Sequence, residues 1–266
     1  MNKLQTFDKT IFEHVKNTND QFTKHFHDTY TIGITHDGKF KSLHGKKTFY
    51  LYKNSTKVIN PGEVHGGDSN SWKYTNFYPS IELISQIYEQ IFYEKKSPIF
   101  TKHTIDDVVL CNLLRQFFIN TYSNSNKMET ETSLITALSY LIKNYTHKTK
   151  VYEPVFNKKP IIKNSVEFIQ DSLESNITLD DLAQISNLSK YHFLRTFKNT
   201  TGLTPHQYIL IKRVEKGKEL ISKGINLNEI AYHTGFSDQS HFNRSFKRVY
   251  GYSPSTLNKN IFKTKQ

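Results

Sequence analysis

The sequence has little cysteine and no long apolar run. Its 266 residues include a single cysteine, Cys111, which lies among apolar residues. One cysteine excludes an internal disulfide bond and a cysteine-based zinc site, so we expect Cys111 to be a buried helix residue. No stretch approaches about 18 consecutive apolar residues, and the N-terminal segment MNKLQTFDKT lacks the apolar core of a signal peptide. We therefore expect a cytoplasmic protein without membrane contact.

Acidic residues are scarce relative to basic ones. The chain has 36 Lys and Arg residues against 24 Asp and Glu residues, which gives a formal net charge of +12. This balance favours a polyanionic partner such as nucleic acid, although lysine-rich surfaces also occur on proteins that bind nothing acidic. The length suits two domains, each with a core of its own.

Residue patterns divide the chain near its middle. Residues 22–78 are rich in Thr, Tyr, Phe and Gly with the short alternating runs of strands, and helical spacing follows over residues 81–93, 105–122 and 130–145. The segment THKTKVYEPVFNKKP at residues 146–160 has four lysines, two prolines and no apolar period. That composition predicts a linker.

After the linker, apolar residues recur at helical intervals with Gly or Asn at the breaks, and no strand pattern remains. The predicted fold class is therefore α+β in two domains. We expect a sheet-rich domain with trailing helices over residues 1–147, a linker over residues 148–160, and an all-α domain over residues 161–266.

The all-α half contains an internal repeat. LAQISNLS at residues 182–189 is answered 48 residues later by IAYHTGFS. With one inserted residue the offset becomes 49, and six further residues recur. They are Phe193, Arg195, Phe197, Lys198, Gly202 and Pro205, which return as Phe242, Arg244, Phe246, Lys247, Gly251 and Pro254. So many matches in one register indicate a duplicated unit.

Each copy has the pattern of a helix-turn-helix. A capping oxygen and a carboxylate three residues later begin a first helix, and a small residue within that helix permits a close crossing. A residue that tolerates left-handed backbone then makes the turn, and a serine caps the second helix. The residues concerned are Thr178, Asp181, Ala183, Asn187 and Ser189 in the first copy and Asn226, Glu229, Ala231, Gly235 and Ser237 in the second.

The second helix of each copy has a polar and basic outer face, opposite two phenylalanines that face inward. Arg and Gln can read base edges, Tyr and Leu can contact thymine methyl groups, and Lys and Ser can hold phosphates. The candidate DNA-binding residues are Tyr191, Leu194, Arg195 and Lys198 in the first unit and Gln239, Ser240, His241, Arg244 and Lys247 in the second. The alternative for one such hairpin is a solvated surface, but two copies in register favour double-stranded DNA.

A helix from Pro205 to Ser222 is predicted to join the two units and to fix their spacing. A further helix over residues 161–173 precedes the first unit, because Ile162, Val166 and Ile169 share one stripe. These additions bring the expected number of helices in the second half to about seven.

Residues 161–258 resemble the DNA-binding domain of AraC/XylS-type transcription regulators. LSKYHFLRTFKNTTGLTPHQYI matches the first recognition helix and its following turn, and IAYHTGFSDQSHFNRSFKRVYGYSP matches the most diagnostic stretch of that family. The resemblance implies two recognition helices in successive major grooves, about 34 Å apart. It implies base-reading roles for Tyr191, Leu194, Arg195, Gln239, Ser240, His241 and Arg244.

One departure from the family pattern is Gly217, where such regulators usually have Ala. A glycine within a helix costs roughly 1 kcal/mol relative to Ala. The linking helix of this chain is therefore expected to be less rigid than the corresponding helix of most such regulators.

The first half resembles the sensor domain of the same family, a small cupin-like β-barrel followed by helices. The match covers about residues 20–80 and rests on HFHD at residues 25–28, a turn HDG at residues 36–38 and NPGEVH at residues 60–65. The resemblance implies a barrel that binds a small-molecule effector.

The histidines of these motifs raise the question of a metal. If His25 and His27 lie on one strand they point to the same side, and with His65 they could bind a metal as a catalytic cupin does. Cupin enzymes add a carboxylate a few residues after the paired histidines, but the segment TIG at residues 31–33 fills that stretch here. We therefore expect no metal and no other cofactor.

Aromatic and imidazole groups of this half offer an effector an apolar wall with a few hydrogen-bonding points. The candidate ligand-binding residues are His25, His27, Tyr30, His65, Trp72 and Tyr74. The alternative is that these residues cap and pack the barrel rim.

The predicted function is sequence-specific DNA-binding transcription regulation under the control of a small effector, without enzymatic activity. The alternative is a metal-dependent cupin enzyme with a helical appendage. A DNA-repair regulator that transfers alkyl groups to its own cysteines would need more than Cys111. In the family, helices such as those at residues 105–122 and 130–145 often pair two chains, so we expect a homodimer formed through residues 1–145. RNA polymerase is a further candidate partner.

Overall fold

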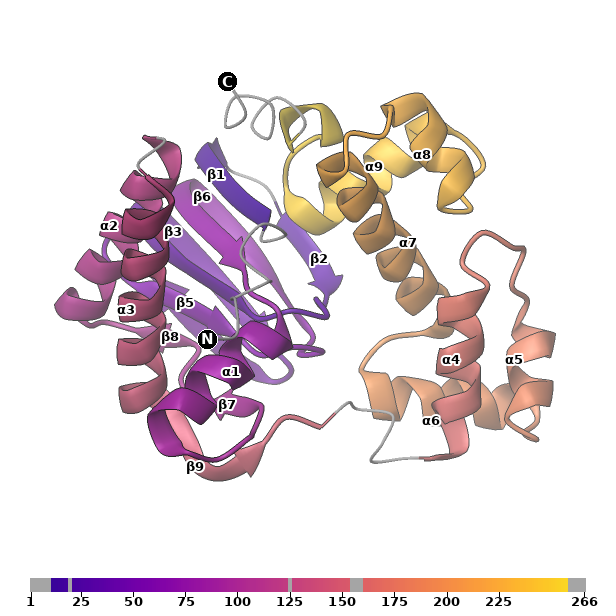
Figure 1. Cartoon of the computed structure of the whole chain (residues 1–266). Helices are drawn as coiled ribbons and strands as arrows, with labels where there is room; N and C mark the ends of the chain where they lie inside the picture. Colours follow the sequence, from indigo (N-terminus) through magenta and orange to yellow (C-terminus); the bar gives the residue numbers. More distant parts are fainter. Residues whose placement is uncertain (1–10, 19–20, 124–125, 154–159, 258–266) are drawn as a thin grey trace.

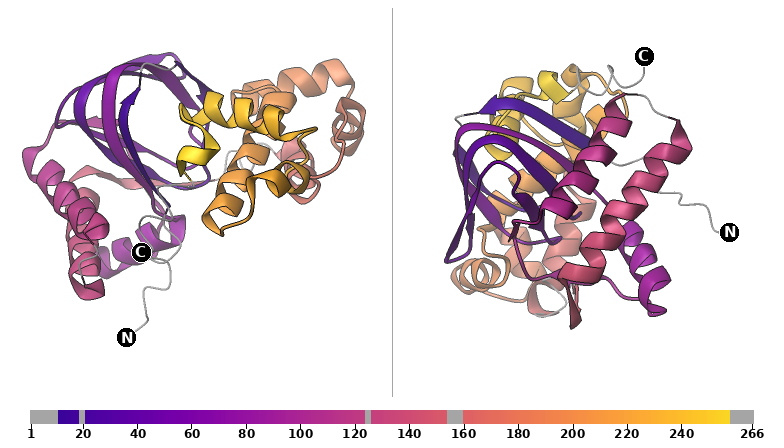
Figure 2. Two further views of the ribbon diagram at one scale, coloured as in Figure 1. Left: turned by 90° about the horizontal axis from the view of Figure 1, so that it is seen from above. Right: turned by 90° about the vertical axis from the view of Figure 1, so that its left-hand side faces the viewer.

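The computed structural model describes residues 11–18, 21–123, 126–153 and 160–257 (Figure 1). A curved sheet forms the centre of the N-terminal half. Three helices of the same half lie along one side of this sheet, and the C-terminal helices lie against another side (Figures 1 and 2). The expected division into a sheet-rich half and a helical half is confirmed.

The sheet is antiparallel and curls into an open barrel (Figure 2). Its strands run in the order β1 (Ile11–Thr18), β6 (His65–Tyr78), β3 (Thr31–His44), β5 (Thr56–Ile59) and β8 (Thr104–Ile105). In addition, β2 (Gln21–His25) pairs with β6 and β4 (Lys47–Leu51) pairs with β3. The register of β3 on β6 sets Ile32 opposite Phe77 and His44 opposite His65.

Several segments outside the predicted strand region belong to sheets, among them β1, the first part of the predicted linker, and β8, whose Ile105 was predicted to begin a helix. β1 was missed because Glu13 is buried, which breaks the alternation of apolar and polar residues. The prediction of a linker was also wrong for its first residues, because β9 (Thr146–Val151) pairs with β7 (Pro98–Phe100). The sequence did not reveal this strand, because the backbone hydrogen bonds that pair it with β7 do not require a periodic pattern of apolar residues. Residues 154–159 of that linker lie outside the described residues.

The three N-terminal helices are α1 (Ile81–Phe92), α2 (Val108–Tyr122) and α3 (Lys127–Tyr145). α2 begins three residues later than predicted because the Asp107 side chain caps it by accepting hydrogen bonds from the backbone N–H groups of Val109 and Leu110. α3 begins earlier than predicted because Asn126 caps it. Cys111 is buried within α2, as expected.

Apolar side chains fill both sides of the sheet. Toward α1, α2 and α3 they include Ile32, Phe77 and Phe117. The barrel interior is filled by Phe40, Leu51, Trp72 and Tyr74. Trp72 and Tyr74 face the same way because side chains two residues apart share one face of a strand, and their rings stack with centroids 3.9 Å apart.

The C-terminal half is helical throughout its described residues, as predicted. A 3₁₀ turn (Pro160–Ile162) leads into α4 (Lys163–Asp171), α5 (Leu179–Ile185), α6 (Lys190–Thr201), α7 (Pro205–Ser222), α8 (Leu227–His233) and α9 (Gln239–Tyr250). Residues 254–257 are helical again. α7 has the bounds predicted for the linking helix. None of the helices in the described ranges is long and apolar enough to cross a membrane.

The predicted cap of the last helix was wrong by one residue. Asp238, not Ser237, caps α9, and its carboxylate accepts the backbone N–H of His241 at 2.7 Å. The Ser237 hydroxyl instead donates to Asp238. The residue inserted in the second copy provides this carboxylate, which is a stronger acceptor than a serine hydroxyl and is favoured by the helix dipole.

The packing of α9 against α7 requires a glycine at position 217, so Gly217 does more than lower the helix propensity of α7. A Cβ atom at this position would lie 2.7 Å from Cζ of Phe242, which is a severe overlap, and 3.3 Å from Cγ2 of Ile230. The absence of a side chain at Gly217 therefore lets the phenylalanine of α9 pack directly on the backbone of α7.

Replacing Gly217 with Ala should destabilise the protein by roughly 1–3 kcal/mol, because the methyl group overpacks against Phe242. Helix propensity alone predicts the opposite sign, a gain of about 1 kcal/mol. The measurement is the midpoint of urea unfolding. Glu219→Ala, at an exposed position of the same helix, is the control and should change stability by less than about 0.5 kcal/mol. A more stable Gly217→Ala variant would contradict the close packing.

Candidate functional site

The first helix-turn-helix unit consists of α5 and α6. Thr178 and Asp181 form the predicted capping box at the start of α5, and Asn187 has the left-handed backbone of the turn, with φ 52°. Phe193 and Phe197 of α6 are fully buried. The opposite face of α6 exposes all four predicted DNA-binding residues, Tyr191, Leu194, Arg195 and Lys198.

The second unit, α8 and α9, repeats this geometry. Gly235 makes the turn with φ 73°, and Phe242 and Phe246 are buried. Ser240, Arg244 and Lys247 are exposed, whereas Gln239 and His241 are half-buried. His241 is held in place, because its ring lies 5.1 Å from that of Phe236 and its Nδ1 lies 3.3 Å from the hydroxyl of Ser237.

The two outer faces carry the chemistry that base recognition requires. Arg195 and Arg244 occupy equivalent positions, and neither forms an ion pair with any residue in the described ranges. Each guanidinium is therefore available for a bidentate contact with a base. The 18 residues of α7 lie between the units (Figure 1). A helix of that length spans about 27 Å, which suits two recognition helices in neighbouring major grooves about 34 Å apart.

Sequence reasoning missed part of this surface. An open groove of about 510 Å³ is lined by Gln21, Asn243, Arg244, Lys247, Arg248 and Ser253. The groove brings Gln21 of the sheet domain beside the basic end of α9. No sequence pattern could show this, because the two segments are more than two hundred residues apart.

The barrel interior holds a second candidate site, with a cavity of about 20 Å³. Five of the six predicted ligand-binding residues line it: His25, His27, His65, Trp72 and Tyr74. Val249 and Tyr250 of α9 line it from the helical half. Tyr30 lies elsewhere, because its hydroxyl donates to the carbonyl of Pro98 and its ring packs on Phe100. Tyr30 is therefore a core residue.

The three histidines of the cavity are close together and uncharged. The ring centroids of His25 and His65 are 4.3 Å apart, and those of His27 lie 5.0 Å and 5.2 Å from them. Burial lowers the pKa of His25 to about 4 and the pKa of His27 and of His65 well below the usual value. All three imidazoles are consequently neutral near pH 7 and keep a lone pair on one ring nitrogen.

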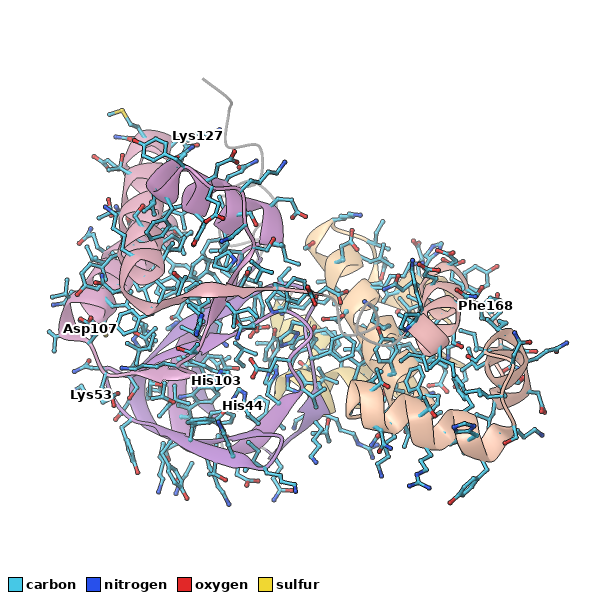
Figure 3. The ribbon with its side chains drawn as sticks, turned by 90° about the horizontal axis from the view of Figure 1, so that it is seen from below. His44, Lys53, His103, Asp107, Lys127 and Phe168 are labelled. Atoms are coloured by element: carbon cyan, nitrogen blue, oxygen red, sulfur yellow. The ribbon has the colours of Figure 1, made fainter. Side chains whose placement is uncertain are left out.

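A second histidine cluster, not foreseen from the sequence, lies near the first. His44 and His103 stack with ring centroids 4.3 Å apart (Figure 3). Glu63 accepts from His103, with Nε2 and Oε1 3.0 Å apart, and Oε1 lies 3.7 Å from Nδ1 of His44. Burial alone would raise the pKa of Glu63, but these two histidines outweigh it and hold that pKa below its usual range. The cluster is an ion-paired network between strand ends and a loop.

The linking helix contacts the sheet domain through a stripe of charged residues. Lys212, Glu215 and Lys218 are spaced three residues apart, so they follow one face of α7. In the sheet domain they meet Asp28, His27 and Glu13 respectively. A carboxylate therefore does lie beside the histidines, although the predicted cupin position lacks one. It comes from the helical half.

Glu13 lies at the centre of this interface and is 3% exposed. It accepts a hydrogen bond from the Lys218 ammonium and from the hydroxyls of Tyr78 and Tyr252, both at 2.5 Å. The Lys218 ammonium also lies 3.7 Å and 4.1 Å from the ring centroids of Tyr78 and Tyr250. Both charges are thus buried, paired and hydrogen-bonded.

Replacing Glu13 with Ala should cost about 3–5 kcal/mol of unfolding free energy, because it leaves the Lys218 ammonium buried without a counter-charge. The double variant Glu13→Met with Lys218→Met should recover most of that loss, since it removes both charges. Urea unfolding of the full chain provides the measurement. Lys73→Ala, which breaks an exposed pair with Asp37, is the control and should leave the midpoint almost unchanged. Equal losses in the single and the double variant would show that packing, not charge pairing, holds this interface.

Comparisons with known proteins agree with both halves of this description. A family model described as an AraC-like ligand binding domain matches residues 11–138, and one described as a helix-turn-helix domain matches residues 182–260. YbfI of Bacillus subtilis, an uncharacterized HTH-type transcriptional regulator, is 28% identical over 229 residues, which is 83% of this chain and 81% of YbfI. The transcriptional activator AarP of Providencia stuartii is 34% identical over 96 residues, which is 36% of this chain and 71% of AarP.

The fold also matches a solved structure over its whole length. A crystal structure of apo ToxT from Vibrio cholerae superposes with a TM-score of 0.64 and 15% sequence identity, covering 96% of this chain and 97% of ToxT. At this identity the likeness concerns the two-domain fold alone.

Proposed function

Since this chain belongs to the AraC family of transcription regulators, with a ligand-binding domain and a helix-turn-helix DNA-binding domain, we propose that α6 and α9 read two successive major grooves of its target DNA. The observation that carries this proposal is the equivalent placement of Arg195 and Arg244 on the outer faces of the two recognition helices.

Each exposed side chain has a role in this proposal. Arg195, Arg244 and Gln239 read base edges, and Tyr191 and Leu194 contact thymine methyl groups. Ser240 and His241 read bases at the start of α9, where Asp238 and Ser237 orient them. Lys198 and Lys247 hold phosphates, so binding weakens steeply as salt rises.

Arg195→Ala and Arg244→Ala should each reduce discrimination at one base pair by about 1–3 kcal/mol, and the two variants should affect different base pairs. The preferred duplex is first selected from random sequences with the full chain, and affinities for single-base variants of it are then measured by gel shift.

The matched control for this experiment is Lys53→Ala, which removes an exposed cation from the turn between β4 and β5 (Figure 3). It should leave both affinity and discrimination unchanged. If Arg244→Ala weakens binding to all sequences equally, Arg244 contacts only phosphate. Absence of any preferred sequence would refute the proposed function.

The N-terminal barrel is proposed to be the sensor of the regulator rather than an enzyme active site. Its interior is closed by Tyr250 and Val249 from α9, so a change within the barrel acts directly on the second recognition helix. One similar ToxT structure contains an unsaturated fatty acid. A molecule of that size does not fit a cavity of about 20 Å³, so the effector of this chain is small or enters a more open barrel.

The remaining expectations follow from this role and are part of the proposal. The sequence assigned the sensor to residues 1–147, the linker to residues 148–160 and the DNA-binding domain to residues 161–266. Because β9 pairs with β7, we place the end of the sensor at residue 151 and the linker at residues 152–160. DNA is the partner, so the protein works in the cytoplasm, where RNA polymerase is the second partner that an activator would contact.

We also propose a homodimer. Its interface involves a different surface of the helices from the apolar stripes that were recognised in the sequence. The α3 stripe of Leu134, Leu138, Leu141 and Ile142 is buried within the same chain. On α2, by contrast, Val108, Ile119 and Tyr122 are 71%, 52% and 40% exposed. These three residues fall along one face at helical spacing, which supports pairing of α2 with α2 of a second copy.

Ile119→Glu should shift the full chain from dimer to monomer at micromolar concentration, because it places a charge in an apolar interface. Sedimentation velocity gives the mass of each species. Lys46→Glu, at an exposed turn between β3 and β4, is the control and should remain dimeric. A wild-type chain that sediments only as a monomer at micromolar concentration would refute this dimer.

A further inference from the structure

The three buried histidines come from two neighbouring strands and from the loop that follows the first of them, and they converge on one place. His25 ends β2, His27 follows two residues later, and His65 begins β6, where it pairs in register with His25. Each imidazole offers one ring nitrogen, and these nitrogens lie within 4.8 Å of one another. Three neutral imidazoles with converging nitrogens form a set of donors suited to a transition-metal ion.

The hydrogen bonds around the cluster fix which nitrogen of each ring is free. Nδ1 of His25 lies 2.6 Å from the carbonyl of Thr23, and Nδ1 of His65 lies 2.9 Å from the carbonyl of Glu63. Because a carbonyl only accepts, each Nδ1 carries the hydrogen and each Nε2 keeps the lone pair.

The third ring follows the same pattern. Nδ1 of His27 lies 3.4 Å from Oε1 of Glu215, an oxygen that can accept its hydrogen. Acceptors behind the remote ring nitrogens are the arrangement that orients histidine ligands in metal sites. Plain packing of a barrel rim would not require all three rings to be held in this way.

The space beside the histidines also suits an ion. The cavity measures about 20 Å³, whereas one water needs about 10–15 Å³ on the same measure. Of the charged groups near the cluster, the Lys218 ammonium is paired with the Glu13 carboxylate. Burial lowers the pKa of Lys57, which lines the cavity, to about 8, and raises the pKa of Glu215 to about 8. A bare divalent ion fits this cavity, and an organic effector does not.

We propose that His25, His27 and His65 bind one divalent transition-metal ion, such as zinc, through their Nε2 atoms, and that this ion is the effector of the sensor barrel. The second part of this statement rests on the proposed function as a regulator. Zinc–nitrogen bonds of about 2.1 Å at tetrahedral angles set the nitrogens about 3.4 Å apart. Where two of these nitrogens are farther apart than this, binding draws their rings together.

Glu215 connects this movement to the DNA-binding half. It lies on α7, and its buried Oε2 has no hydrogen-bond partner among the described residues, although the Lys212 ammonium lies 3.8 Å from it. A metal on Nε2 of His27 makes the Nδ1 hydrogen a stronger donor, which draws the Glu215 carboxyl oxygen, 3.4 Å away, toward a hydrogen bond. The ion thus changes how firmly the linking helix is held against the barrel, and through it the placement of the two recognition helices.

The first test is Co²⁺ binding by the metal-free full chain, purified without a histidine tag. We expect one equivalent to remain bound after gel filtration and to give the visible absorption of a nitrogen-coordinated ion. His25→Gln and His65→Gln should each remove that absorption. His103→Gln, in the neighbouring cluster, should retain it. DNA binding by the metal-free variants confirms that they are folded.

The second test is the effect of saturating Co²⁺ on affinity for the selected DNA site. The wild type should show a change of at least about fivefold, the size of a modest coupling between sites. Glu215→Gln should still bind Co²⁺ but lose most of this change. Glu219→Gln, at an exposed position on the same helix, should keep it.

Several results would overturn the proposal while leaving the proposed function intact. They are a chain that binds DNA but no Co²⁺, absorption that disappears in His103→Gln rather than in His65→Gln, and bound Co²⁺ that leaves DNA affinity unchanged. A chain that binds Co²⁺ but shows no preferred DNA sequence would instead refute the proposed function, and with it the role of the ion as an effector.

Discussion

The buried pair of Glu13 and Lys218 is the interaction on which the arrangement of the two halves depends. A carboxylate at 3% exposure and an ammonium at 4% exposure are costly to bury separately, and neither half alone can neutralise its own charge at this position. Docking supplies the partner, and Tyr78 and Tyr252 satisfy the remaining acceptor capacity of the carboxylate. The pair therefore favours one relative placement of barrel and linking helix over others that would leave a charge without its partner.

The same helix carries the contacts that position the second recognition helix. On one face α7 presents Lys212, Glu215 and Lys218 to the barrel, and at Gly217 it lets the ring of Phe242 approach its backbone. α9 closes the mouth of the barrel with Tyr250, whose ring stacks on His27 at 5.7 Å. A movement of His27 thus reaches α9 both directly and through Glu215. This is the physical route by which a change in the barrel can alter DNA recognition.

Much of the helical half followed from local chemistry in the sequence. Capping residues such as Thr178 and Asn226, the turn residues Asn187 and Gly235, and the paired phenylalanines act over three to five residues, so each predicts its element without a partner. The error at Ser237 also has a local cause, because the inserted Asp238 is the better capping group. In the sheet, the alternation of apolar and polar residues identified strands only where one face was uniformly apolar. β1 was not recognised because Glu13 interrupts this alternation.

The sequence by itself determined the helix-turn-helix units, the linking helix and the outer faces that carry Arg195 and Arg244, because helical periodicity places those side chains without long-range contacts. Only the tertiary structure decided what the N-terminal histidines face. His25 and His65 meet through strand pairing across forty residues, and Glu215 reaches His27 from another domain. Tyr30, close to His27 in sequence, turns into a different core. Convergence of this kind depends on pairing register and domain docking, which no local pattern encodes.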